Sequence, residues 1–284
     1  MADIETECKA VLDLMRASIA DSPLGEEADR YIETIGIGKM LRARLALQLG
    51  AASGANSKRL RSAGAAVELV HAATLLHDDV IDGGSLRRGL PAFWVAHGTQ
   101  GAILMGDMLL IKATQIVKDY GDPVLTSALI DLTGEVCMAE VEQELLLRGK
   151  QIDWDTCVSL ARRKTGSLFA FSACAAATED DMAVALKEAG YLLGTAYQLG
   201  DDFLDASGNV GEAQKTLGQD SLRNKGTAVT AAGPEAQNAS EFISNLCTSA
   251  TRTLEPWPKL ENAWISYLKG TVLPLLKVYL DSGS

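Results

Sequence analysis

Two clusters of aspartates end two apolar stretches of the chain and share one spacing. Both have the pattern Asp-Asp-x-x-Asp, and they consist of Asp78, Asp79 and Asp82, and of Asp201, Asp202 and Asp205. Residues four apart share a face of a helix, so Asp78 and Asp82 point the same way. Like charges one turn apart repel unless a cation lies between them. A single cluster would most simply be a solvated acidic helix end, but two clusters of identical spacing predict two aspartate faces across one cavity.

The cation that best suits these carboxylates is Mg²⁺. It takes one or two protein carboxylates, keeps several waters and completes its shell with phosphate oxygens. The paired clusters therefore predict a Mg²⁺ site that holds a diphosphate between two helix ends.

The elements that would position the clusters are helices. Apolar residues recur at helical spacing, and we find no convincing alternation of apolar and polar residues that would predict strands. Ser57 begins the helix that ends in the first cluster. Asp122-Pro123 begins another, and Asp153 and Thr178 are predicted N-caps of the next two, the second of which ends in the second cluster. Further helices are expected over 2–20, 38–47, 100–119, 236–252 and 260–281, with loops at 83–91 and 206–235.

The chain shows no repeat of fixed length and no linker long enough to divide it. We therefore expect one all-α domain over residues 1–284, a bundle of about ten or more helices around a central cavity. Facing helices of such bundles build metal sites from their side chains.

Composition excludes several other classes of protein. Of the 284 residues 47% are hydrophobic and only 7 are proline, which is typical of a folded helical chain. A net charge of −11 argues against a general nucleic-acid binder. The 5 cysteines form no Cys-x-x-Cys pair, the start of the chain is acidic, and no apolar run approaches a membrane span. We expect a soluble cytoplasmic protein with reduced cysteines.

At this point the motifs resemble a known family. The first aspartate cluster, then Arg87-Arg88-Gly89, then the second cluster resemble an all-E (trans) polyprenyl diphosphate synthase over roughly residues 36–227. Smaller motifs agree in order and spacing: Gly38-Lys39-Met40-Leu41-Arg42, Glu68-x-x-His71, Lys164-Thr165, Gln198, Lys215-x-x-Gly218-x-Asp220 and Lys225. The resemblance implies a chain-elongating prenyltransferase that joins isopentenyl diphosphate head-to-tail to an allylic prenyl diphosphate.

The resemblance also assigns roles to these residues. Ionisation of the allylic diphosphate needs Mg²⁺ and fixed cations around the leaving group. The leading metal ligands are Asp78, Asp82 and Asp201, supported directly or through water by Asp79, Asp202 and Asp205. The same diphosphate is expected to contact Arg87, Lys164, Lys215 and Lys225, and the catalytic set also includes Thr165 and Gln198.

Isopentenyl diphosphate must not ionise, so a basic pocket without metal suits it. The candidates are Lys39, Arg42, His71 and Arg88, because ammonium and guanidinium groups match phosphate oxygens. The plain alternatives are a core histidine for His71 and a solvated loop for Arg87-Arg88.

The chain departs from the family pattern at several positions. Where the pattern has glycine, arginine and proline, the chain has Ile37, Met40 and Ala43, so one basic contact is lost. Arg44 could replace that contact only if the helix is turned differently. After Asp220 the pattern's Gly-Lys becomes Asn224-Lys225, and its later Leu-Pro is missing.

Other functions fit the motifs less well. Lys164-Thr165 lacks the glycines of a P-loop, and a di-iron bundle needs a second Glu-x-x-His, which the chain lacks. A terpene cyclase has a different second metal motif and needs no isopentenyl pocket, and a squalene-type synthase carries Asp-x-x-x-Asp. A non-catalytic partner subunit of a synthase would lose aspartates, whereas both clusters are intact.

Product length depends on the residues before the first cluster. Val70, Ala73 and Thr74 lie one to two turns before Asp78, and none is aromatic. Short-chain members of the family tend to place a ring there, so we expect a product of geranylgeranyl length or longer, with a short-chain farnesyl synthase as the alternative. Met105, Met108 or Ile111 could also form the tunnel floor. A homodimer is expected from the family.

Overall fold

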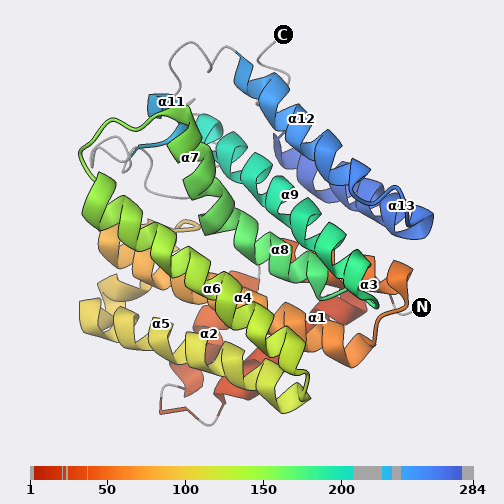
Figure 1. The fold of residues 1–284 in the computed structure, drawn as a ribbon. Helices are drawn as coiled ribbons and strands as arrows, with labels where there is room; N and C mark the ends of the chain where they lie inside the picture. Colours follow the sequence, from red (N-terminus) through yellow and green to blue (C-terminus); the bar gives the residue numbers. More distant parts are fainter. Residues whose placement is uncertain are drawn as a thin grey trace.

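Helices make up almost all of the structure. The computed structural model describes residues 3–20, 22–23, 25–36, 38–206, 226–231 and 238–276. The α-helices of these residues are α1 (Ile4–Ile19), α2 (Gly25–Gly36), α3 (Leu41–Ser53), α4 (Ser57–Asp82), α5 (Phe93–Tyr120), α6 (Pro123–Val141), α7 (Trp154–Ala161), α8 (Ser167–Cys174), α9 (Asp180–Ala206), α11 (Ala228–Ala231), α12 (Ala239–Arg252) and α13 (Pro258–Tyr267). The expected all-α fold is confirmed (Figure 1).

Three helices continue as π-helices within the described residues. The π-helices are η1 (Glu142–Leu147), η2 (Arg162–Gly166) and η4 (Leu268–Val272). They follow α6, α7 and α13 without a break, and η2 leads directly into α8. π-Helical turns occur often at functional sites, and η2 carries Lys164 and Thr165, which the sequence singled out.

Helix α4 lies at the centre of the assembly. It packs against α1, α3, α5, α6 and α8. The Asn56 side chain caps its start by accepting from the backbone N–H groups of Lys58 and Arg59 at 2.9 and 3.2 Å. Its end at Asp82 is fixed by Gly83, whose φ of 59° is left-handed and favours glycine. Both bounds of α4 agree with those predicted from the sequence.

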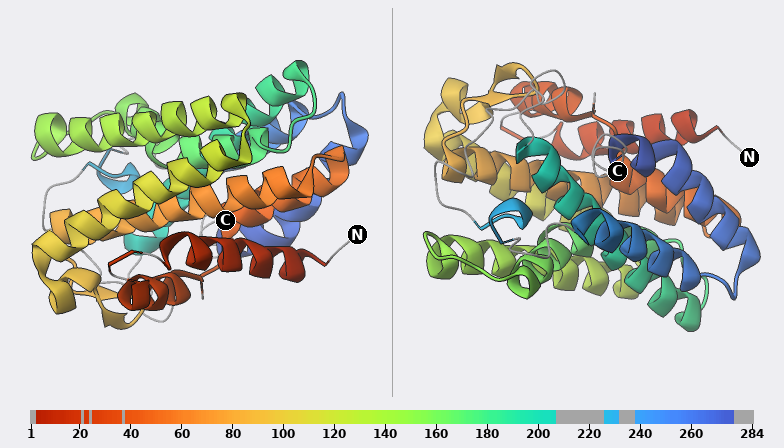
Figure 2. Two further views of the ribbon diagram at one scale, coloured as in Figure 1. Left: turned by 90° about the horizontal axis from the view of Figure 1, so that it is seen from below. Right: turned by 90° about the horizontal axis from the view of Figure 1, so that it is seen from above.

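Helices α4 and α9 both pack against α8. Figures 1 and 2 show α4 and α9 running in the same direction across the bundle. Their C-terminal ends therefore lie on the same side of the molecule, and these ends carry the two aspartate clusters.

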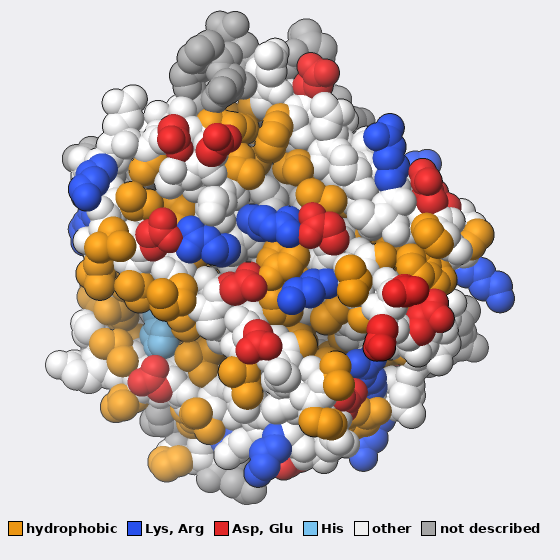
Figure 3. Space-filling model, in the orientation of Figure 1, with side chains coloured by type: hydrophobic (Ala, Val, Ile, Leu, Met, Phe, Trp, Pro, Cys, Tyr) orange, Lys and Arg blue, Asp and Glu red, His pale blue; other side chains and the backbone are white. Residues whose placement is uncertain are grey.

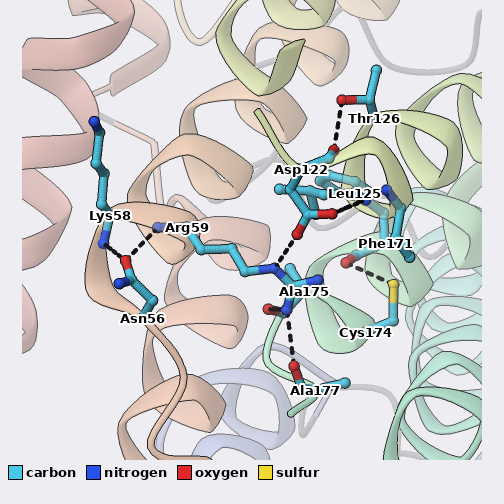
Figure 4. A network of polar contacts seen from close by, with 11 residues as sticks. Asn56, Lys58, Arg59, Asp122, Leu125, Thr126, Phe171, Cys174, Ala175 and Ala177 are labelled. Atoms are coloured by element: carbon cyan, nitrogen blue, oxygen red, sulfur yellow. Dashed lines mark hydrogen bonds and ion pairs between the residues drawn. The ribbon is translucent and has the colours of Figure 1, made fainter. Parts of the chain in front are cut away.

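Arg59, near the start of α4, ties three helices together (Figure 4). Its Nε donates to the Asp122 carboxylate at 2.9 Å, and its Nη1 donates to the carbonyls of Ala175 and Ala177 at 2.7 and 2.9 Å. Asp122 also caps α6 by accepting from the N–H groups of Val124 and Leu125, both at 3.0 Å. The cap predicted at Asp122 is confirmed, and it is also a tertiary contact.

The segment after α4 is more regular than the expected loop. Strands β1 (Leu86–Arg87) and β2 (Leu90–Pro91) form a small antiparallel hairpin. Arg88 and Gly89 connect them with φ of 53° and 76°, the positive values at both positions that a type I′ turn requires. Helix α5 then starts earlier than predicted, with a kink at Gly98, whose φ is 74°.

Of the two other predicted N-caps, one is confirmed and one is wrong. Asp153 caps α7 by accepting from the Thr156 N–H at 2.8 Å. Thr178 does not cap the next long helix, because α9 begins at Asp180. Residues 228–231, expected to be loop, form the short helix α11.

The buried apolar side chains form one cluster that draws on helices from α1 to α13. Fully buried Trp264 and Tyr267 of α13 join Phe169 and Phe171 of α8 in it. A single domain with a central cavity stays a prediction. In the described part of the chain, every helix is too short or too polar to cross a membrane.

Candidate active site

The three aspartates of the first cluster face different surroundings. Asp79 is buried, whereas Asp78 and Asp82 are half-buried. Arg87 of the hairpin donates through Nε and Nη2 to the Asp79 carboxylate, with the Nε contact at 3.1 Å. The helix thus turns Asp79 toward an arginine, while Asp78 and Asp82, four residues apart, share another face.

The hairpin holds its two arginines in different environments. Side chain Arg87 is 19% exposed, and although burial opposes it, Asp79 raises its pKa. Burial lowers the pKa of the half-buried Arg88, and the neighbouring positive charge of Arg87 lowers it further. The Trp94 indole fixes the start of the hairpin by donating to the Gly84 carbonyl at 2.7 Å. The arginine pair is therefore partly desolvated, not the solvated loop considered from the sequence.

Asp202, in the second cluster, sits in a chain of hydrogen bonds. The Thr165 hydroxyl of η2 donates to the side-chain oxygen Oε1 of Gln198, and Gln198 Nε2 donates to Asp202 Oδ1 at 2.8 Å. Asp202 Oδ2 accepts from the N–H of Ala228 at 2.9 Å. Both carboxylate oxygens of Asp202 are thus engaged within the protein. Asp201, next to it on α9, is half-buried.

Lys164 lies where the π-helices η1 and η2 meet. Its Nζ is 2.7 Å from Glu140 Oε1 and donates to Gln143 Oε1 at 2.6 Å. The neighbouring Arg163 pairs with Glu142 of η1 at 2.7 Å. Gln143 and Glu140 were not singled out by the sequence, because acidic and amide residues on a helix are common and carry no motif of their own.

The start of α3 carries two of the predicted isopentenyl-pocket residues. Lys39 is exposed, whereas Arg42 is buried, with its guanidinium carbon 5.1 Å from the centre of the Phe169 ring. Burial lowers the pKa of Arg42, and nearby Glu68 opposes that change. Arg44 pairs with Glu5 of α1 at 2.7 and 2.8 Å, so it does not take the place of the arginine that Met40 replaces.

Glu68 is a buried residue to which the sequence assigned no role in the site. Its side chain is directed at the start of α3, where Oε1 accepts from the Ala43 N–H at 3.0 Å. Its position three residues before His71 was its only signal in the sequence. His71 itself is half-buried, and its carbonyl accepts from the Thr74 hydroxyl at 2.8 Å.

The residues predicted to control product length lie inside α4. Val70 and Ala73 are fully buried in the hydrophobic cluster, and Thr74 is half-buried. Of the other floor candidates, Met105 is fully buried, whereas Ile111 is 60% exposed. The surroundings favour Met105 over Ile111 as a wall of any interior tunnel.

Three predicted site features lie outside the described residues. These are Lys215, Lys225 and the side chain of Asp205. Within the described part of the chain, no group of three or more His, Cys, Asp or Glu side chains is arranged to hold a metal ion. Mg²⁺ needs only one or two protein carboxylates when phosphate oxygens complete its shell. A half-buried pair such as Asp78 and Asp82 is a suitable donor set.

Comparison with known proteins gives clear relatives. A geranylgeranyl diphosphate synthase of Methanosarcina mazei is 34% identical over 212 residues, which cover 72% of this chain and 65% of that protein. A probable farnesyl diphosphate synthase of Sinorhizobium fredii is 33% identical over 255 residues, covering 81% and 73%. An octaprenyl diphosphate synthase of Haemophilus influenzae is 31% identical over 212 residues, covering 73% and 64%. The chain thus spans less than two thirds of the length of the first and third of these relatives.

Solved structures share the fold. A polyprenyl synthase from Caulobacter crescentus, complexed with calcium and isoprenyl diphosphate, has a TM-score of 0.74 and 27% identity, covering 98% of this chain and 87% of that one. A geranyltransferase from Helicobacter pylori, complexed with magnesium and isoprenyl diphosphate, has a TM-score of 0.77 over 94% and 95% of the chains, and its 19% identity shows the fold alone. A family model described as polyprenyl synthetase matches residues 25–257. The chain therefore belongs to the polyprenyl synthetase family.

Proposed function

We propose that this protein is a chain-elongating prenyltransferase, which condenses isopentenyl diphosphate with an allylic prenyl diphosphate. One observation carries the proposal: two Asp-Asp-x-x-Asp helix ends lie on the same side of the bundle. Membership of the polyprenyl synthetase family supports it. So do the names of the relatives, which are all prenyl diphosphate synthases.

Asp78, Asp82 and Asp201 would hold Mg²⁺ at this side of the bundle. The structures from C. crescentus and H. pylori contain calcium or magnesium with isoprenyl diphosphate, which supports a divalent ion here too. Mg²⁺, when bound, neutralises the charge that develops on a departing diphosphate. Asp79 and Asp202, engaged by Arg87 and Gln198, suit the supporting role.

Fixed cations of the chain would bind the allylic diphosphate. A guanidinium has five N–H donors, so Arg87 can hold Asp79 and also donate to phosphate oxygens. Lys164 has three donors and makes contacts with Glu140 and Gln143. Lys215 and Lys225 complete the proposed set. Thr165 and Gln198 orient Asp202 through their hydrogen bonds.

The second substrate would bind without metal. Lys39 is exposed, His71 and Arg88 are half-buried, and Arg42 is buried. We propose that these four hold isopentenyl diphosphate, because ammonium and guanidinium groups bind phosphate oxygens as charge-assisted partners. Apolar walls would exclude water, which would otherwise quench a carbocation.

The product is proposed to be geranylgeranyl diphosphate or longer. Relatives with farnesyl, geranylgeranyl and octaprenyl names match the chain about equally well. The support therefore comes from the residues: Val70, Ala73 and Thr74 place no ring before the first aspartate cluster.

A homodimer is proposed on the basis of exposed apolar side chains on neighbouring helices, which together we call the α5–α6 face. It comprises exposed side chains of α5, α6 and η1, namely Leu104, Ile111, Met138, Val141 and Leu145. Figure 3 shows hydrophobic side chains among charged ones across the side of the molecule that presents these helices. Exposed apolar surface of this kind often marks a protein interface. We further propose that the protein acts in the cytoplasm and binds no nucleic acid.

One assay tests the activity. The protein is incubated with isopentenyl diphosphate, an allylic diphosphate and Mg²⁺, and the products are identified by mass spectrometry. We expect a longer prenyl diphosphate. A hydrocarbon would indicate a cyclase, and no product would indicate a non-catalytic subunit.

The metal ligands are tested with the same assay. Asp78→Ala should lower turnover by orders of magnitude, about 100-fold or more, while its circular dichroism spectrum stays that of the wild type. EDTA should abolish activity and added Mg²⁺ should restore it. Turnover near that of the wild type in Asp78→Ala would overturn the ligand assignment.

A further inference from the structure

Helix α3 begins without a cap of its own. Its N-cap residue Met40 is left-handed, with φ and ψ both 44°, and its side chain makes no capping hydrogen bond. The first N–H groups of a helix have no partner within the helix and need one from elsewhere. The uncapped turn contains Arg42 and follows Lys39, two of the residues proposed to hold isopentenyl diphosphate.

A carboxylate from another helix supplies the missing acceptor. Glu68 lies near the middle of α4 and is 3% exposed. It accepts a hydrogen bond from the backbone N–H of Ala43 at 3.0 Å. Burial raises the pKa of the Glu68 carboxyl, and the positive charge of Arg42 and the Ala43 N–H oppose that rise.

The contact depends on a departure of this chain from its family. The family pattern places proline at position 43, and proline has no N–H to donate. Ala43 provides that N–H and packs tightly on α4, with its Cβ 3.3 Å from the position that a Cβ on Gly64 would occupy. The Glu68 bond to position 43 is therefore available to a chain with alanine there.

The capped turn directs a buried guanidinium. Arg42 lies over the Phe169 ring, and no atom of the described residues accepts a hydrogen bond from its buried Nε. Tyr267 of α13 holds the same turn by donating to the Leu41 carbonyl at 2.8 Å. Since the backbone of the turn is fixed from two sides, the point at which the Arg42 side chain leaves the helix is fixed with it.

We propose that Glu68 is a positioning residue for the homoallylic diphosphate, isopentenyl diphosphate. It caps α3 from α4 and so holds the backbone of Lys39 and Arg42 in the binding geometry. This inference rests on the proposed function. The inference adds Glu68 to the proposed function, as a residue that does not touch the substrate and acts through the start of α3.

Two variants separate the effect of side-chain length at position 68 from the effect of its charge. Glu68→Gln keeps the length of the side chain and an oxygen that accepts from Ala43, but loses the charge. Glu68→Asp keeps the charge but is one methylene shorter. If the cap positions the pocket, Glu68→Asp should raise KM for isopentenyl diphosphate about tenfold, the effect of losing a cap of typical strength. Glu68→Gln should stay within about twofold of the wild type, and in both variants KM for the allylic substrate should hardly change.

Binding measured without turnover gives a second readout. Isothermal titration of isopentenyl diphosphate in EDTA isolates the pocket that needs no metal, and Glu68→Asp should weaken it by about the same factor. Gln48→Ala is the matched control, because it removes a bond from α3 to the Ala263 carbonyl at 3.1 Å, away from the first turn. It should leave both KM values unchanged.

The outcomes are distinct. If the wild type elongates prenyl diphosphates but Glu68→Asp changes neither KM nor binding, or raises both KM values equally, the positioning role is wrong. A larger effect of Glu68→Gln than of Glu68→Asp on KM or binding would also overturn the positioning role. The charge of the side chain, and not its length, would then matter. If the wild type binds and elongates nothing, the proposed function fails, and this inference fails with it.

Discussion

At the scale of residues, the three aspartates of the first cluster lie in different environments. Asp79 faces inward and meets Arg87, whereas Asp78 and Asp82 are half-buried and can approach a ligand. Identical side chains within one helical turn therefore differ in burial. The spacing of the sequence places Asp79 on a different helix face from Asp78 and Asp82. The hairpin brings Arg87 to Asp79.

The Asp79–Arg87 pair should contribute to stability. Its side chains are 6% and 19% exposed, so solvent screens the pair weakly. Asp79→Asn leaves a partly buried guanidinium without its carboxylate and should lower the free energy of unfolding by about 2 kcal/mol. Urea unfolding of the wild type and of Asp79→Asn at neutral pH measures this difference in the free energy of unfolding. As a control, Asp13→Asn removes the exposed pair with Lys9 and should change that free energy little; equal effects of the two variants would contradict the argument.

Some residue roles could be predicted from the sequence, and others could not. The motif identified Arg42 but not its burial over Phe169, because burial depends on how α8 packs against α3. Glu68 was seen only as a neighbour of His71, since its contact with Ala43 joins residues 25 apart in the chain. Local spacing carries no information on such contacts.

At the scale of elements, helix starts with a strong local signal were predicted well. Asp122 and Asp153 are capping residues whose carboxylates accept from backbone N–H groups of the first helical turn, and Pro123 begins α6. The π-helices η1 and η2 were not predicted, because one extra residue in a turn changes the hydrogen-bond pattern without changing composition. The hairpin was missed because strands of two residues are too short to show alternation.

The contact between Arg59 and Asp122 makes the junction of α4 and α6 sensitive to acid. Burial would raise the pKa of Asp122, but two backbone N–H groups and Arg59 together lower it below the usual 3.8. A lowered folded pKa stabilises the protein above the unfolded pKa, and that stability is lost as pH falls through the folded pKa. Asn also caps helices, so Asp122→Asn chiefly removes the charge.

Urea unfolding of the wild type and of Asp122→Asn at a series of pH values tests whether the charge of Asp122 stabilises the protein. Near neutral pH the variant should be less stable than the wild type by about 1 kcal/mol. The difference should shrink as pH falls below 3.8. A difference that stays constant or grows toward acid would show that the charge of Asp122 does not matter.

Packing between α4 and α5 bears on product length. Ala73 is fully buried on α4, the helix that packs most closely with α5. If the growing chain passes there, Ala73→Phe should shorten the product by one or more five-carbon units, with an overpacking cost of about 1–3 kcal/mol in stability. Mass spectrometry of the dephosphorylated products measures the length. An unchanged product, or a wild type that stops at farnesyl, would refute the tunnel hypothesis.

At the scale of the whole molecule, the α5–α6 face contrasts with the closed interior. Met138 and Leu145 are 65% and 75% exposed although they are large and apolar. Removing apolar area from water is favourable by roughly 25 cal/mol per Å². The sequence could not predict this face, because the helical pattern of α6 does not say which of its two apolar sides the core covers.

Met138→Glu places a charge on the α5–α6 face and should shift the protein toward monomer. Light scattering coupled to gel filtration measures the mass. Val184→Glu is the control, since Val184 is 72% exposed on α9, outside this face. A wild type that is monomeric at micromolar concentration, or equal effects of both variants, would exclude the proposed dimer.

The bond between Asp202 and Ala228 joins residues 26 apart in the chain and has a spectroscopic consequence. In deuterated water, an amide proton exchanges only when its hydrogen bond opens. The exchange rate at Ala228 therefore reports how often Asp202 releases it. A ligand that draws Asp202 toward a cation would raise the exchange rate of the Ala228 amide. A ligand that leaves Asp202 in its supporting position would leave that exchange rate unchanged or lower it.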